Sequence, residues 1–293
     1  MSDQPAIRVT DVTRDYRRAR TSLVKPAPVV PALRGVSLSV DKGRRFGIVG
    51  ESGCGKSTLL RIIAGLDQPT SGSVQIGGVE IARLPERRLG FLRSQLQMVF
   101  QDPMGSLDPR MRVGDIIAEP LVAQGHRKNR ARVHELLEAV GLRPDAADRF
   151  PHQFSGGQRQ RISIARALAP EPQILVADEP VSALDVSVRA QVLNLLADLV
   201  DRLSLTLVFV SHDLTVVRHV CDSVAVMSLG EVVESGPTSQ VYQAPQHPYT
   251  RQLVAAAPRL QAALSGRSAS VLAADTLAAR RRGPQDAPAG RYR

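Results

Sequence analysis

Residues 44–66 read RRFGIVGESGCGKSTLLRIIAGL. The apolar residues that lead up to Gly50 predict a short, buried β-strand that runs into glycines. From residue 56 onward the pattern is helical, and we expect the helix to end at Gly65, ahead of Pro69. A strand, a loop and a helix in this order form the building unit of a parallel α/β sheet.

The loop between this strand and this helix fits the pattern G-x-x-x-x-G-K-[ST]. Its glycines let backbone N–H groups surround phosphates, its lysine can reach the terminal phosphates, and the next hydroxyl can hold Mg²⁺. The alternative is a glycine-rich turn that matches by coincidence, and the strand and helix on either side argue against it. The candidate nucleotide-binding residues are Gly50, Glu51, Ser52, Gly53, Cys54, Gly55, Lys56, Ser57 and Thr58.

Polar residues end two further apolar strands. The stretch QILVADEP (173–180) contains Asp178 and Glu179 at its end, and LTLVFVSHD (205–213) brings His212 to the end of its strand. Ligands bind beyond the carboxyl ends of the strands in parallel sheets, so we expect these side chains at one edge of the sheet. Solvated carboxylates and a structural histidine are the alternatives.

These side chains suit phosphoryl transfer. Asp178 can hold a metal ion, and Glu179 can polarise a water molecule for in-line attack on a phosphate. Gln101 follows a short apolar run in MVFQDP and could reach either the metal ion or that water. We therefore predict Glu179, His212 and Gln101 as catalytic residues, and Ser57, Gln101 and Asp178 as metal-binding residues.

A second glycine-containing helix start lies in FSGGQRQRISIARAL, residues 154–168. The helix should stop at Pro170, and its start leaves backbone N–H groups free for an anion. Gly156 and Gly157 lack a Cβ, and we expect the space so left to admit a phosphate. Because the phosphates bound by this chain are expected at Lys56, that phosphate would come from outside the chain.

The rest of the chain alternates strands with helices, which predicts a parallel sheet with an inserted helical lobe. We expect strands over 7–16, 33–40 and 72–78, helices over 114–150 and 188–203, and a hairpin over 223–236 with Gly230 in its turn. Residues 17–31 are basic and then proline-rich, which indicates a surface loop. Residues 259–293 are rich in Ala and Arg and are expected to form a loose tail.

Together these segments resemble the ATPase subunits of ATP-binding-cassette (ABC) transporters. In that family the aromatic residue at the position of Tyr16 stacks on adenine, residues 50–58 form the Walker A loop, and Gln101 lies in the Q-loop, which couples to the membrane subunit. No catalytic position departs from the family pattern. The remaining matches are Asp178 in Walker B, Glu179 as the catalytic base, Asp185 in the D-loop and His212 as the switch histidine.

The second helix start matches the signature motif of the same family. Phe154 stands where Leu is commoner, and Ser155, Gly156, Gly157 and Gln158 follow the pattern. The resemblance implies that two such chains face each other head to tail. Each ATP is then held between the phosphate loop of one chain and the signature of the other, where a helix start without side chains lets the backbone approach a γ-phosphate.

A finer resemblance is to the oligopeptide, dipeptide and nickel importer branch. It rests on FQDPMGSLDPR (100–110), HQFSGGQRQRI (152–162), ADEPVSALDVS (177–187) and a C-terminal extension, VYQAPQHPYTRQLVAAAP (241–258). No cysteine follows Cys221, so we expect no iron–sulfur cluster after the His-Pro-Tyr segment. The extension offers no phosphate ligand and should break regular structure at Pro248. A chain that ends near residue 240 is therefore expected still to bind nucleotide.

The resemblance implies a RecA-like P-loop NTPase core with a parallel sheet, an antiparallel β subdomain at the N-terminus and an α-helical signature subdomain inserted at about 105–168. The nucleotide-binding domain should span 1–258, with the importer extension at about 236–258. The implied activity is hydrolysis of ATP with Mg²⁺, coupled to solute import from the cytoplasmic face of the inner membrane. The implied partners are two integral membrane permease subunits, a second, related ATPase chain in a heterodimer rather than a homodimer, and an extracytoplasmic solute-binding protein.

Composition bears on the other classes of function. The formal net charge of +10 would permit a nucleic-acid-handling ABC ATPase. However, the interval between phosphate loop and signature carries neither heptads nor cysteines, and the chain holds one cassette where translation types fuse two. We therefore expect no nucleic-acid partner. Glu179 and His212 argue against a regulatory subunit without turnover, and no apolar run approaches the roughly 18 residues of a membrane span.

Overall fold

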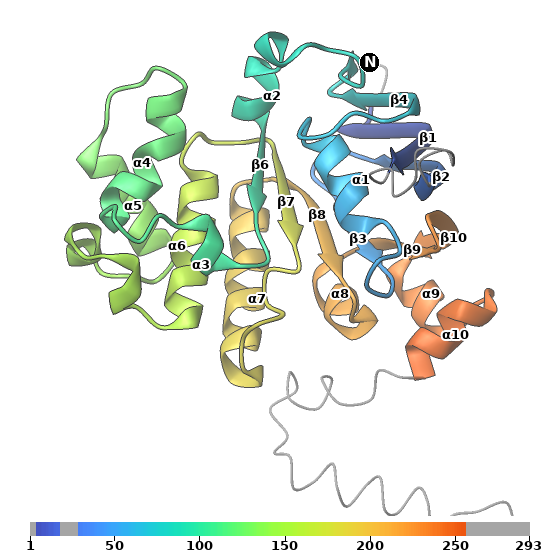
Figure 1. The fold of residues 1–293 in the computed structure, drawn as a ribbon. Helices are drawn as coiled ribbons and strands as arrows, with labels where there is room; N and C mark the ends of the chain where they lie inside the picture. Colours follow the sequence, from blue (N-terminus) through green and yellow to red (C-terminus); the bar gives the residue numbers. More distant parts are fainter. Residues whose placement is uncertain (1–3, 18–28, 256–293) are drawn as a thin grey trace, which may run out of the picture.

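The computed structural model describes residues 4–17 and 29–255 of the 293-residue chain. Figure 1 shows a central sheet with a smaller sheet beside it near the N-terminus and a group of helices on the opposite side. The central sheet is mostly parallel, and the smaller sheet is antiparallel. The α/β class predicted from the sequence is confirmed.

The central sheet has six strands in the order β10-β9-β3-β8-β7-β6. All neighbours run parallel except the outermost pair, β9 and β10, which is antiparallel. The carboxyl ends of the parallel strands therefore meet at one edge. The strands are β3 (Arg45–Val49), β6 (Leu96–Val99), β7 (Ile174–Asp178), β8 (Thr206–Ser211), β9 (Ser223–Ser228) and β10 (Glu231–Pro237).

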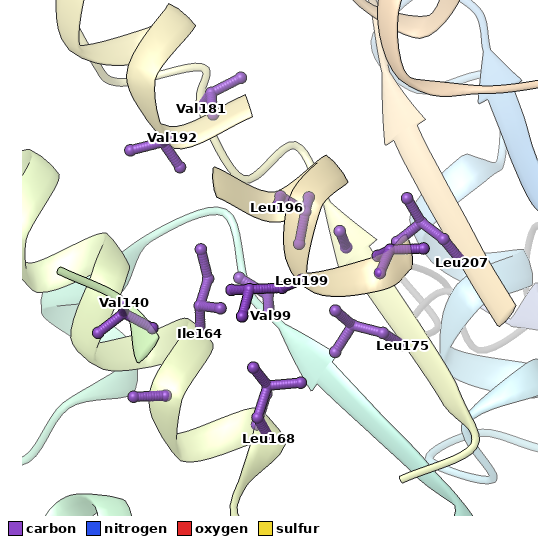
Figure 2. Close-up of a cluster of buried hydrophobic side chains, with 14 of the residues drawn as sticks. Val99, Val140, Ile164, Leu168, Leu175, Val181, Val192, Leu196, Leu199 and Leu207 are labelled. Atoms are coloured by element: carbon purple, nitrogen blue, oxygen red, sulfur yellow. The ribbon is translucent and has the colours of Figure 1, made fainter. Parts of the chain in front are cut away.

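Alternate residues of these strands face two hydrophobic cores. Leu175 lies on the side of helices α6 (Gly156–Leu168), α7 (Val186–Arg202) and α8 (Leu214–Val220), and Figure 2 shows it among side chains of α6 and α7. Val176 lies on the other side, with α1 (Lys56–Ile63) and the N-terminal sheet. Burial on both faces explains why these strands read as nearly continuous apolar runs.

The N-terminal sheet is antiparallel, with the order β2-β1-β4-β5. Its strands are β1 (Ile7–Arg17), β2 (Val29–Val40), β4 (Ser71–Ile76) and β5 (Val79–Glu80). The predicted loop over 17–31 was wrong at its ends, because Arg17 pairs with Val29 and Asp15 pairs with Pro31. Pro31 can sit there because β2 is an edge strand. The middle of the predicted loop lies outside the described residues.

The helical lobe lies between β6 and β7 in the chain, to the left in Figure 1. Helices α4 and α6 pack together, and both contribute to the core under the sheet. Side chains cap three helix starts here, since Asp102 accepts from the Met104 N–H, Asn129 from the Arg132 N–H and Ser155 from the Gln158 N–H. The helices around and within this lobe are α2 (Gly90–Gln95), α3 (Pro103–Ser106), α4 (Val113–Ala123) and α5 (Arg130–Ala139).

The described chain ends in two short helices, α9 (Thr238–Gln243) and α10 (Pro248–Ala255), which follow the β9–β10 hairpin predicted around Gly230. Pro248 was expected to break regular structure, and instead it begins α10. A proline suits the first helical position because its missing N–H would have no partner there. The expected loose tail, 259–293, lies outside the described residues. None of the helices in the described ranges is long and apolar enough to cross a membrane.

Candidate active site

The glycine-rich loop joins the end of β3 to the start of α1, as the sequence predicts. Gly53 and Gly55 have φ values of 83° and 108°, in the left-handed region that favours glycine. A Cβ on Gly50 would lie 2.3 Å from the Met227 carbonyl oxygen of β9. The hairpin after β9 also holds the loop, because the Gly230 N–H donates to the Cys54 carbonyl at 3.0 Å.

Lys56 reaches back across this loop. Its ammonium donates hydrogen bonds to the carbonyl oxygens of Gly50 at 2.7 Å and Glu51 at 2.9 Å, and the residue is buried. The loop is thus curled around a positive charge. Such a charge can bind the terminal phosphates of a nucleotide, and the bare N–H groups at the start of α1 add to the same field.

Cys54 lies inside the same loop and is buried. Burial raises the pKa of its thiol, and the Lys56 ammonium acts in the opposite direction. The thiol is therefore the neutral form at physiological pH. Its Sγ would lie 2.7 Å from a Cβ on Gly50, so the side chain also fills space against the strand end.

Asp178 ends β7 next to this loop. Burial, and then the charge of Glu179, raise its pKa, while a hydrogen bond from the Ser57 hydroxyl and the charge of Lys56 oppose the rise. Its Oδ1 atom is buried and has no hydrogen-bond partner among the described residues. A buried carboxylate oxygen without a partner, beside a hydroxyl, fits a hard divalent cation such as Mg²⁺.

Glu179 is the centre of a cluster at the ends of three strands. Its carboxylate Oε2 lies 3.0 Å from His212 Nδ1 and accepts a hydrogen bond from Gln101 Nε2 at 3.4 Å. Glu179 itself has a φ of 44°, which is strained for a residue with a side chain. The structure thus brings together all three residues that the sequence predicts as catalytic. A carboxylate held by a histidine and an amide is equipped to orient a water molecule.

A cavity of about 460 Å³ opens beside Asp178 and Gln101. Its far wall is formed by α3 and by Arg166 of α6, which was not predicted from the sequence. The Arg166 guanidinium donates to the Ser106 carbonyl and lies 3.6 Å from Glu119. Burial lowers its pKa and Glu119 opposes this. The one feature of the sequence that could have indicated this role for Arg166 is its position among the apolar residues of RISIARAL.

Tyr16, the predicted adenine-stacking residue, lies on β1 and is exposed. Its hydroxyl donates to Asp67 at 2.7 Å, and the Arg14 guanidinium lies 4.6 Å from the centre of its ring. Arg14 also forms an ion pair with Asp67. The contacts of Tyr16 among the described residues are thus with these two side chains, and they do not by themselves bring it to the phosphate loop.

The start of α6 differs from the expectation. The Ser155 hydroxyl accepts from the Gln158 N–H at 3.3 Å, and the Gln158 side chain accepts from the Ser155 N–H at 3.0 Å. A Cβ on Gly157 would lie 2.3 Å from Val188 Cγ1 of α7, so that position faces a neighbouring helix. The space left by the missing Cβ of Gly157 is therefore filled by α7, which the sequence did not indicate, and the role of its N–H toward a phosphate stays a prediction. A Cβ on Gly156 would meet Leu184 at an ordinary 3.5 Å.

Asp185, the predicted D-loop residue, begins α7. Its carboxylate accepts from the Val188 N–H at 3.0 Å, which makes it the N-cap of that helix. Arg189, one turn later, donates to the carbonyls of Ser182 and Leu184. These bonds fix the loop that connects Glu179 to α7.

The chain is similar to known proteins of one family. Residues 33–182 match the ABC transporter family, and residues 233–280 match the family Oligopeptide/dipeptide transporter, C-terminal region. Over 253 residues the chain is 49% identical to the Di/tripeptide transport ATP-binding protein DppF of Pseudomonas aeruginosa (strain UCBPP-PA14), covering 85% of this chain and 78% of that protein. Over 260 residues it is 46% identical to the Dipeptide transport ATP-binding protein DppF of Escherichia coli (strain K12), covering 88% of this chain and 78% of that protein.

A solved structure resembles the fold. It is a dimeric structure of the ATP-binding cassette MJ0796 in a post-hydrolysis state bound to ADP and Pi, with a TM-score of 0.70 and 33% identity. The match covers 79% of this chain and 98% of that one. The resemblance to the oligopeptide and dipeptide importer branch is confirmed by the match over residues 233–280 and by the two DppF relatives. The chain therefore belongs to the ABC transporter family and is an ATPase of that family.

Proposed function

We propose that this chain is the energy-coupling subunit of an ABC importer for di- or oligopeptides, or for a related solute such as nickel. The observation that carries the proposal is the joint position of the phosphate loop and the Gln101–Glu179–His212 cluster at one edge of the sheet. The importer assignment is supported by the match over residues 233–280 and by the names of the relatives.

The residues that contact the nucleotide follow from the loop. Backbone N–H groups of residues 50–58 would bind the phosphates, and Lys56 would exchange its two carbonyl acceptors for phosphate oxygens. Tyr16 would stack on the adenine after a change in its contact with Arg14. We also propose that the nucleotide-binding domain spans residues 1–258 and that its importer extension begins at about residue 236.

Hydrolysis would use the cluster around Glu179. Its carboxylate would accept a proton from the attacking water, His212 would hold that carboxylate in place, and Gln101 would orient the water from the other side. Ser57, Asp178 and Gln101 would hold Mg²⁺, which supplies neutralisation of charge on the phosphates when bound. The strained φ of Glu179 supports a fixed orientation for its side chain.

The signature would act on a nucleotide of another chain. In the described residues, no hydrogen bond or ion pair joins residues 155–158 to residues 50–58. We therefore keep Ser155 to Gln158 as groups that complete a site on a partner, and Asp185 as the D-loop residue. That partner would be a second, related ATPase chain, and the complex would include two permeases and an extracytoplasmic solute-binding protein. The chain would lie at the cytoplasmic face of the inner membrane. Nothing in the comparisons supports the nucleic-acid alternative.

Glu179→Gln tests the proposed base. It keeps the size of the side chain and removes its proton affinity, so hydrolysis by the assembled complex should fall by roughly 10²-fold or more while ATP binding remains. Glu171→Gln is a matched control, because Glu171 is also a glutamate with positive φ, at 55°, and its carboxylate pairs with Arg132 elsewhere on the surface. Near-normal hydrolysis by Glu179→Gln would exclude Glu179 as the base.

The solute is tested separately. The chain is combined with candidate permeases, its related ATPase and the binding protein in vesicles, and ATP hydrolysis is measured with added dipeptides, longer peptides or Ni²⁺. Peptide-stimulated hydrolysis is the expected result. Stimulation by none of these solutes would contradict the importer assignment and leave the ATPase assignment in place.

A further inference from the structure

The C-terminal extension contacts the phosphate loop directly. The Glu51 N–H donates a hydrogen bond to the Tyr249 hydroxyl at 2.8 Å, across a separation of 198 residues. Tyr249 lies in the first turn of α10, which Figure 1 shows next to α9. The sequence predicts no role for this segment in nucleotide binding, so the contact is unexpected.

Neighbouring groups hold Tyr249 firmly. The Glu234 carboxylate of β10 accepts from the N–H groups of Gln246 and His247, each at 2.9 Å, and so anchors the start of α10. Burial tends to raise the pKa of Glu234, but these hydrogen bonds outweigh it and the pKa is lowered. The Tyr249 ring packs against the core with Leu253 of the same helix.

The extension and the hairpin therefore hold the loop at two points. Tyr249 binds the Glu51 N–H near the start of the loop, and the Gly230 N–H binds the Cys54 carbonyl farther along it. The Lys56 ammonium lies inside the loop and donates hydrogen bonds to the carbonyls of Gly50 and Glu51. The Glu51 peptide unit is thus fixed on both sides, its N–H by Tyr249 and its C=O by Lys56.

We propose that Tyr249 is a positioning residue for ATP binding, which places the phosphate loop and makes the C-terminal extension part of the nucleotide site. A neutral phenol suits this task, because it accepts from an N–H without bringing negative charge near phosphates. When ATP enters, Lys56 must leave its carbonyl acceptors for phosphate oxygens. The bond to Tyr249 then becomes the remaining side-chain tie on the Glu51 peptide, and the loop keeps its shape.

Tyr249→Phe in the full-length chain removes only the hydroxyl. One lost hydrogen bond predicts an increase of about 3- to 10-fold in the Kd for MgATP, measured by calorimetry. In the assembled complex KM should rise with kcat within about 2-fold, because Tyr249 touches no reacting atom. Tyr242→Phe is the matched control: Tyr242 lies in the same extension, its ring packs against the core and under the Arg218 guanidinium, and among the described residues its hydroxyl has no hydrogen-bond partner.

A second measurement tests how firmly the phosphate loop is held when no nucleotide is bound. Cys54 is buried in the loop and Cys221 is buried in the core, so their maleimide labelling rates in one sample separate local loosening from global unfolding. Tyr249→Phe should speed labelling of Cys54 several-fold and leave Cys221 unchanged. Should Tyr249→Phe fail to fold, Glu234→Gln, which weakens the anchor of α10, is expected to raise the same Kd.

Two results would overturn the proposal. The first is a folded Tyr249→Phe chain with the wild-type Kd and Cys54 labelling rate, whatever its thermal midpoint. The second is an equal rise in Kd in Tyr242→Phe, which would show a general effect of the extension in place of a specific bond. A chain truncated near residue 240 should also bind MgATP more weakly, in contrast to the expectation from sequence.

Discussion

Two helices of this molecule begin at glycine-containing segments, and their first turns are built differently. Helix α1 begins after Gly55, which has a left-handed φ of 108°, and no side chain caps its first N–H groups. Helix α6 begins after Ser155, whose hydroxyl caps the Gln158 N–H while the Gln158 side chain caps the Ser155 N–H. The N–H groups in the first turn of α1 are free to bind a ligand, whereas one in the first turn of α6 already donates to a side chain of the same helix start.

Glycine is required at the two helix starts for different structural reasons. A Cβ on Gly55 would lie 2.5 Å from the Ala32 carbonyl, and its backbone conformation excludes other residues as well. Gly157 has an ordinary backbone and is required because α7 packs against it through Val188. A glycine at a helix start can therefore indicate either an anion site or a close helix contact. Only the Gln158 N–H of this turn is capped, and the helix itself offers no acceptor to the N–H groups of Gly156 and Gly157, so we propose that a partner's phosphate binds there.

The largest effect is expected at the start of α1. Lys56→Ala removes the positive charge inside the loop, so MgATP binding should weaken by about 10- to 100-fold, as expected for a charged hydrogen bond. Arg61→Ala removes a cation from the last turn of the same helix and should change binding by less than about 2-fold. Nucleotide-dependent thermal stabilisation is the measurement. An unchanged shift of the midpoint in Lys56→Ala would argue against the phosphate-loop assignment.

A smaller effect should separate the two glycines of α6. Gly157→Ala places a methyl group against Val188 and should lower the free energy of unfolding by about 1–3 kcal/mol. Gly156→Ala meets only an ordinary contact and should be neutral or slightly stabilising. Denaturant unfolding measures both. In a Gly157→Ala, Val188→Ala double variant the cost should not be additive; simple additivity would show that Val188 is not the cause.

The smallest effect concerns the cap of α6. Ser155→Ala removes the hydroxyl that accepts from the Gln158 N–H, and the expected loss is about 1 kcal/mol of unfolding free energy. Asn129→Ala, at the N-cap of α5 in the same lobe, should cost a similar amount and serves as the reference. If Ser155→Ala costs nothing while Asn129→Ala does, the start of α6 is not held by its own side chains in solution.

Local sequence patterns predicted the central sheet and the cluster at its edge well. Apolar runs that end in polar residues located Gln101, Asp178, Glu179 and His212, because parallel strands bring their carboxyl ends together. The phosphate loop was found in the same way, since its strand and helix are adjacent in the chain. These features depend on contacts that are short in sequence or imposed by the topology.

The features that sequence reasoning missed depend on particular long-range contacts. The bond from Glu51 to Tyr249 and the contact of Gly157 with Val188 each join segments with no shared pattern in the sequence. The pairing of Val29 with Arg17 extends β2 through a stretch whose prolines indicate a loop. Arg166 was missed because the sequence does not show that its guanidinium can donate to the Ser106 carbonyl, which lies 60 residues earlier in the chain.

We propose that the two helix starts serve different nucleotides, one of this chain and one of its partner. Ser155→Arg tests it most directly, through MgATP binding by the isolated chain and ATP hydrolysis by the complex with its related ATPase and permeases. Binding should stay within about 2-fold of wild type, since no hydrogen bond or ion pair of the described residues joins Ser155 to the phosphate loop, and hydrolysis should be lost at the site that the signature completes. Full hydrolysis by the Ser155→Arg complex, or loss of MgATP binding by the isolated folded chain, would contradict it.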